Sequence, residues 1–238
     1  MSYAENPYAA TSYTFADRAA ANERADFIAK TYAHLAGAIV AFAALEFVLL
    51  NIPGIENLIG LMLGARHSWL VVLGLFMAVS WIADSWARSA ISPARQYMGL
   101  GLYVVAQAVI FVPLLYLAGR LDPGIIPTAA VATLLLFGIM TAIVFITRKD
   151  FSFLRSILMF GGFAALGLIV VAVVAGFALG PIFVWAMIAL ACGYILYDTS
   201  NVLHHYRIGQ HVAAALALFA AVALLFWYIV QLFMSSRD

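Results

Sequence analysis

Charged residues are scarce in this sequence, and their scarcity excludes an ordinary soluble protein. Asp, Glu, Lys and Arg together make up 10% of the 238 residues, whereas 66% of the residues are hydrophobic. A soluble domain has roughly 25% charged residues, so too few are present here to cover a surface in contact with water. We therefore expect an integral membrane protein whose main partner is the lipid bilayer.

Several other features are missing, and each absence removes a class of function. The single cysteine, Cys192, cannot form an intrachain disulfide, a CxxC redox pair or a cysteine-rich metal site. A net charge of +1 gives no basic surface for a nucleic-acid partner. The sequence also lacks GxxxxGKS/T, HExxH, GxSxG and the Rossmann glycine fingerprint. We expect no enzymatic activity, no cofactor and no bound metal ion.

Long apolar runs fill most of the chain. A bilayer core ~30 Å thick is crossed by ~20 residues of α-helix. Segments of that length lie near residues 31–50, 68–87, 97–118, 125–147, 157–177, 182–203 and 212–234. The sequence therefore predicts an all-α, integral membrane fold with seven transmembrane helices in one membrane domain, residues 31–238.

Two segments fall outside the predicted spans. Residues 1–30 are expected to form a cytoplasmic N-terminal segment, disordered at its start and helical from Ala16 to Lys30. The apolar patch at residues 58–65 is too short to cross a membrane and is expected to lie in the interface.

The basic residues are unequally divided between the two sides of a chain with seven spans. The side of the N-terminus has nine of the twelve, namely Arg18, Arg24, Lys30, Arg88, Arg95, Arg148, Lys149, Arg155 and Arg207. The other side has Arg66, Arg120 and Arg237. Because short cytoplasmic loops are enriched in Lys and Arg, we expect the N-terminus to be cytoplasmic.

Three acidic residues fall within the predicted spans: Glu46, Asp84 and Asp198. An ionisable side chain at the membrane centre costs ~2.5 to 3.5 kcal/mol, so each of these acids requires a partner, water or a function. Arg88 follows Asp84 by four residues, and we interpret the two as an interfacial ion pair, with a functional role as the weaker alternative. Glu46 lies near the outer end of its span, from which it is expected to reach headgroups or water, with a functional role as the weaker alternative.

Asp198 differs from the other two because it begins a polar run, Asp198, Thr199, Ser200 and Asn201, directly after an apolar segment. It lies ~7.5 Å below the predicted cytoplasmic interface. Removal from water favours the neutral form of a carboxyl group, so protonation could switch a contact. These four residues are our leading candidates for an ion pathway or pH sensor. The alternative is a helix cap or packing anchor.

Several basic groups lie near this run in the sequence. Arg88, Arg95 and Arg207 are all candidate counter-ions for Asp198, and spacing does not choose among them. His204, His205 and His211 follow in the next loop, where no carboxylate or cysteine stands beside them. We expect these histidines to be solvated rather than to bind a metal.

Two polar segments resemble a known family. ILYDTSNVLHHY at residues 195–206 and TRKDFSFLRSILM at residues 147–159 are similar to segments of the Bax inhibitor/YccA-like family of multi-pass membrane proteins. The resemblance implies a bundle with the last helix central, in a bacterial plasma membrane for the YccA-like branch. It also implies one of two activities, a pH-sensitive calcium leak or the regulation of a membrane-bound protease.

In leak-type members of that family, two aspartates on the last two spans share a proton, and Asp198 matches the first. Ala221 stands where the second is expected, and the last span contains no acid. Without a paired carboxyl group the shared-proton mechanism is lost, which favours a regulatory role. Two hypotheses result: a pH-sensitive cation (calcium) leak at Asp198, and a non-conducting protein that binds a membrane protease or another membrane complex.

Overall fold

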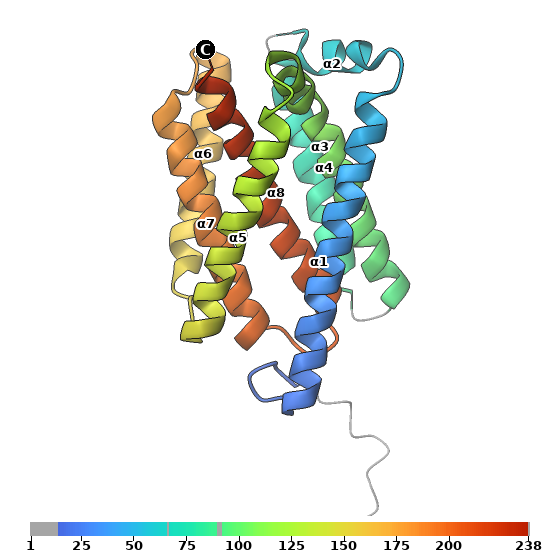
Figure 1. The fold of residues 1–238 in the computed structure, drawn as a ribbon, viewed down its shortest axis with the longest axis vertical. Helices are drawn as coiled ribbons and strands as arrows, with labels where there is room; N and C mark the ends of the chain where they lie inside the picture. The colour runs from blue at the N-terminus through green and yellow to red at the C-terminus, as the bar shows by residue number, and fades with distance from the viewer. Residues whose placement is uncertain (1–13, 66, 90–91, 238) are drawn as a thin grey trace, which may run out of the picture.

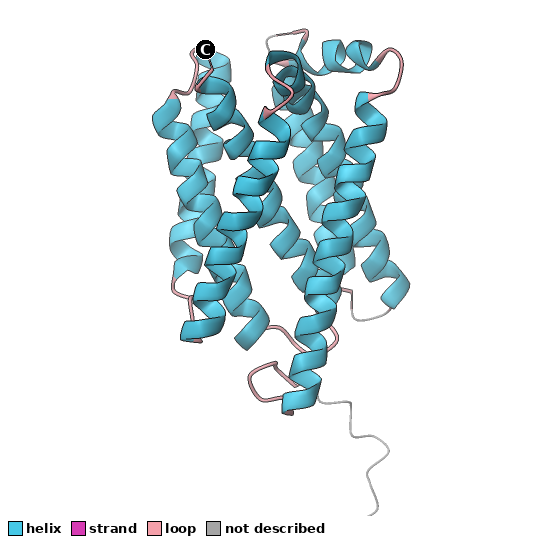
Figure 2. Ribbon diagram, viewed as in Figure 1, coloured by secondary structure: helices cyan, strands magenta, loops and turns pink. Residues whose placement is uncertain are grey.

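The computed structural model describes residues 14–65, 67–89 and 92–237 (Figure 1). Within these ranges every regular element is helical, and Figure 2 shows no strand. The helices are α1 (Ala21–Leu50), α2 (Ile55–Leu63), α3 (Ser68–Ala87), α4 (Pro93–Leu121), α5 (Ile125–Thr147), α6 (Leu154–Ala175), α7 (Pro181–His204) and α8 (His211–Ser235).

Seven of these helices are long and apolar enough to cross a membrane. The exception is α2, which has 9 residues and lies across one end of the bundle (Figure 1). The predicted all-α fold with seven membrane-spanning helices is confirmed, and the chain is a multi-pass integral membrane protein. Pro93 and Pro181 stand in the first turns of α4 and α7, where the missing N–H costs no helical hydrogen bond.

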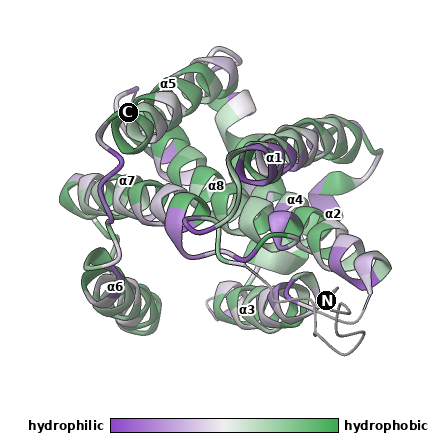
Figure 3. Cartoon of the chain, turned by 90° about the horizontal axis from the view of Figure 1, so that it is seen from below, coloured by the Kyte–Doolittle hydropathy of each residue, from purple (hydrophilic) through white to green (hydrophobic). Residues whose placement is uncertain are grey.

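The last helix, α8, is the centre of the bundle. It packs against α1, α3, α4, α5 and α7, and the view along the helices shows it surrounded by the others (Figure 3). Its first half, HVAAALALFAAVA, is rich in alanine, and small side chains let membrane helices approach closely. This arrangement confirms the predicted central position. By contrast, α6 is peripheral and packs mainly against α7.

We refer to the two ends of the bundle by the chain termini. The N-terminal face has the start of α1 and the α3–α4, α5–α6 and α7–α8 connections, at the bottom of Figure 1. The C-terminal face has α2 and the end of the chain, at the top of Figure 1.

The residues before α1 are bonded to the α7–α8 loop. Ala16 donates its N–H to the Tyr206 carbonyl (2.9 Å), and Ile208 donates to the Thr14 carbonyl (3.0 Å). The Arg207 guanidinium lies over the Phe15 ring, 5.4 Å from its centroid. The prediction of a helix from Ala16 is therefore wrong, because these contacts hold an isolated bridge and the helix begins at Ala21. Residues 1–13, predicted to be disordered, lie outside the described residues.

Candidate functional site

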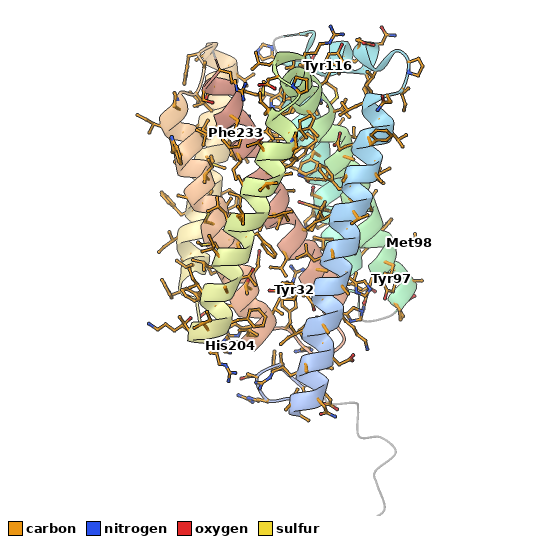
Figure 4. The ribbon with its side chains drawn as sticks, viewed as in Figure 1. Tyr32, Tyr97, Met98, Tyr116, His204 and Phe233 are labelled. Carbon is orange, nitrogen blue, oxygen red and sulfur yellow. The ribbon has the colours of Figure 1, made fainter. Side chains whose placement is uncertain are left out.

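The four polar residues near the end of α7 point in different directions. Asp198 is half-buried and lines a cavity, and the Asn201 side chain bonds its carboxyl group. Thr199 is fully buried, with its hydroxyl near that of Tyr32, which extends from α1 toward α5 (Figure 4). Ser200 is also fully buried and accepts a hydrogen bond from the Phe151 N–H (2.9 Å). Of the four, Asp198 is thus the residue that lines the cavity.

At the end of α3, the predicted ion pair between Asp84 and Arg88 is present. Arg88 Nε lies 2.9 Å from Oδ1 and 2.8 Å from Oδ2 of Asp84. The hydrogen bond to Asp84 raises the pKa of Arg88 above its ordinary value, so the guanidinium is a permanent charge. Arg88 follows Asp84 by four residues, so the two side chains lie on the same face of the helix.

Arg88 also connects α3 to the other end of the site. Its guanidinium interacts electrostatically with Asp198 and forms a hydrogen bond with the Tyr206 hydroxyl. Burial raises the pKa of Tyr206, and the nearby Asp198 carboxylate acts in the same direction. The other two candidate counter-ions lie elsewhere, since Arg95 covers the Trp86 ring and Arg207 the Phe15 ring. The structure therefore selects Arg88.

A cavity of about 1060 Å³ lies between α3, α4, α6, α7 and α8. Its lining is mostly aliphatic and aromatic, and it runs from Leu63 and Trp69 near the C-terminal face to Asp84 and Asp198 near the N-terminal face. Among the lining residues that the structure describes, these two aspartates are the only acids, and none is Lys, Arg or His. The cavity is therefore mostly apolar along its length and acidic at one end.

A second polar cluster joins the α5–α6 loop to the end of α7. The Asp150 carboxylate lies 3.0 Å from His205 Nε2 and accepts the Ser152 N–H at 2.8 Å. Although partial desolvation acts in the opposite direction, these bonds lower the pKa of Asp150. The Ser200 hydroxyl donates to the same carboxylate at 3.4 Å. Sequence reasoning missed Asp150, which lies in a loop 55 residues from His205.

The histidines of the last loop are not simply solvated, as the sequence led us to expect. His205 is beside Asp150, and His204 has a buried Nε2 with no hydrogen-bond partner among the described residues. The His211 ring lies 4.9 Å from that of His34 on α1. His205 is exposed to solvent, as predicted, but a carboxylate distant in sequence is its neighbour. No group of three or more metal-ligating side chains is found among the described residues.

The surroundings of Glu46 also differ from those predicted. Its side chain is 5% exposed, and neither carboxyl oxygen has a hydrogen-bond partner among the residues that the structure describes. The expectation that it reaches headgroups or water is therefore wrong. Position in the sequence placed Glu46 near the end of a span, but its face of α1 turns toward the other helices.

Replacing Glu46 by leucine is expected to raise the free energy of unfolding by about 1–3 kcal/mol, because an unpartnered buried polar group is removed without changing the side-chain volume greatly. Thermal unfolding of the purified protein in detergent measures the change. Glu23→Leu, at an exposed position of the same helix, serves as the control and should change stability by less than about 0.5 kcal/mol. Destabilisation by Glu46→Leu alone would show that the carboxyl group has a stabilising partner.

Comparison with protein families connects these features. The family model described as inhibitor of apoptosis-promoting Bax1 matches residues 24–238. The chain belongs to the Bax inhibitor family. A comparison with curated proteins gives no match. The family match includes all but the first residues of α1 and the whole of every later helix.

In this Bax inhibitor protein the two segments that carry the sequence resemblance are in direct contact. Phe151 and Asp150 belong to one, and Ser200 and His205 to the other. Ala221, which replaces the second expected acid, lines the same cavity as Asp198. The arrangement can therefore attract a cation to one end of the cavity, where Asp198 lines the wall and Asp84 is paired with Arg88.

Proposed function

We propose that this protein is a pH-sensitive cation leak, with calcium as a substrate ion, and that Asp198 is its titrating group. The supporting observation is the chemistry of the cavity wall. Its only acidic lining residues among those described are Asp84 and Asp198, at one end of a large cavity. A negative charge in a low-dielectric wall attracts cations and repels anions. Neither this proposal nor its alternative involves catalysis.

Protonation of Asp198 would act through its neighbours. Ionised Asp198 attracts the Arg88 guanidinium, whereas neutral Asp198 leaves Arg88 to Asp84 and Tyr206. These groups belong to the N-terminal face, where the α3–α4 and α7–α8 connections lie. With nine of the twelve Lys and Arg residues on that side, we propose that this face is cytoplasmic and that Asp198 responds to cytoplasmic pH.

Calcium flux into liposomes that contain the purified protein, measured at pH 6, 7 and 8, tests conduction. We expect flux above that of empty liposomes, with a rate that changes with pH. Flux at the level of empty liposomes, from protein shown to be folded and inserted, would contradict the proposal.

The alternative proposal is a non-conducting regulator that binds a membrane protease or another membrane complex. It is favoured by Ala221, since the cavity lacks the second acid of leak-type members. Such a protein should capture its partner equally well as wild type and as Asp198→Asn. Removal of residues 1–13 should abolish capture if the N-terminal segment is the binding element. The truncation should stop there, because Thr14 and Ala16 are bonded to the α7–α8 loop.

A further inference from the structure

The cavity opens sideways, toward the surrounding bilayer. Residues of both α3 and α6 line it, but α3 packs mainly against α4 and α6 mainly against α7. Viewed along the helices, α3 and α6 lie on the same side of the bundle, with α8 behind them (Figure 3). Trp81 of α3 lines this opening and is 76% exposed. We call it the lateral groove.

The floor of the lateral groove is made by α8. Most of this helix is buried, but Ala217, Ala220 and Leu224 are half-buried and line the groove. Two of these three side chains are single methyl groups, so the groove is deep where it meets α8. Its apolar wall continues through much of the membrane-spanning length, which suits an extended hydrocarbon chain more than a compact ligand.

The groove-facing stripe of each flanking helix ends in an arginine at the N-terminal face. On α6 the stripe contains Gly162, Leu166 and Ile169, and Arg155 lies seven residues before Gly162 on the same helical face. On α3 the stripe contains Ser80 and Asp84, and Arg88 follows one turn later. Arg88 and Arg155 therefore lie on the two sides of the groove at its end near the N-terminal face, which we call the mouth.

The two arginines are not equivalent. Arg88 is neutralised by Asp84, whereas Arg155 is exposed and forms no salt bridge with any residue that the structure describes. α6 begins at Leu154, so the positive end of its helix dipole also lies at this mouth. Asp198, the other acid at this end, is half-buried in the groove wall, whereas Arg155 is exposed in the first turn of α6, so its positive charge lies at the level of the lipid headgroups.

From this combination we propose that the lateral groove binds an anionic phospholipid, with its acyl chains against α8 and its phosphate beside Arg155. The bilayer that surrounds the groove supplies the apolar chains, and the exposed Arg155 guanidinium selects the headgroup charge. This binding site does not depend on conduction. A lipid bound there would, however, occupy the cavity that contains Asp198.

Quenching of tryptophan fluorescence by brominated lipids tests the proposal, because Trp69, Trp81 and Trp227 all line the groove. The protein is placed in nanodiscs of phosphatidylcholine with increasing brominated phosphatidylglycerol. We expect a saturable quenching component that brominated phosphatidylcholine does not give. Arg155→Gln should raise the half-saturating fraction of phosphatidylglycerol about fivefold. Lys149→Gln, which removes an equal charge from the neighbouring loop, should change it less than twofold.

A second pair of variants tests the groove itself. Ala220→Phe fills the floor and should remove most of the saturable component although both arginines remain. Ala142→Phe adds the same volume at an exposed position of α5 outside the cavity and should leave the component unchanged. Equal quenching by the two brominated lipids, or equal effects of Arg155→Gln and Lys149→Gln, would overturn the proposal. A groove closed by a partner helix or a second copy would give no saturable quenching and would overturn it too.

Discussion

Replacing Gly99 by alanine is expected to destabilise the protein by about 3 kcal/mol, the upper end of the usual cost of overpacking. A Cβ atom at this position would lie 2.5 Å from the Ala83 carbonyl oxygen and 2.6 Å from the Ala87 backbone nitrogen. Both atoms belong to the backbone of α3 and cannot rotate away, so α3 and α4 would have to separate. Small residues allow this kind of close approach between membrane helices.

Gly101 provides a matched control two residues away on α4. A Cβ atom there meets nothing within 4 Å, so Gly101→Ala should stabilise the helix by about 0.5–1 kcal/mol. Thermal unfolding of both variants in detergent should therefore give shifts of opposite sign. Equal destabilisation would show that the close crossing of α3 and α4 is not what constrains Gly99.

The same crossing has a functional consequence. Ala83 and Ala87, which Gly99 approaches, are neighbours in sequence of Asp84 and Arg88. A displacement of α3 from α4 would therefore move the ion pair relative to Asp198 on α7. We expect Gly99→Ala to alter any activity of the site, even where enough folded protein remains to measure it.

Much of the fold could be predicted from hydrophobicity alone. An apolar segment of membrane-spanning length has few alternatives to a helix, because every backbone polar group in lipid must be bonded within the segment. The seven long helices follow from that requirement. The central position of α8 required the family resemblance, since its composition resembles that of peripheral α5 and α6. The start of α1 was missed because Thr14 and Ala16 bond a loop distant in sequence.

The site was less predictable, because it depends on which helix faces meet. The i, i+4 spacing was sufficient for Asp84 and Arg88, whose contact lies within one helix. The choice of Arg88 as the neighbour of Asp198, and of Asp150 as the partner of His205, required the packing of separate helices and loops. The burial of Glu46 required the orientation of α1, which its weak amphipathic pattern does not fix.

Asp198→Asn is expected to remove the pH dependence of calcium flux between pH 6 and 8, because the amide that replaces the carboxyl group does not titrate. The matched control is Asp26→Asn, which removes an exposed aspartate of α1 that is paired with Lys30 and does not line the cavity. The control should retain the rate and pH dependence of the wild type. A pH dependence unchanged in Asp198→Asn would exclude this residue as the sensor while leaving conduction itself intact.

The steepness of the wild-type pH dependence distinguishes one titrating group from two. A single carboxyl group changes its ionised fraction by at most about tenfold per pH unit, whereas coupled carboxyl groups can take up protons together. Here Asp84 is held by Arg88, and Ala221 stands in place of the second acid on the cavity wall. We therefore expect a slope of at most about tenfold per pH unit. A steeper slope would require another proton-binding group in the cavity, and the proposed mechanism with Asp198 as the single sensor would fail.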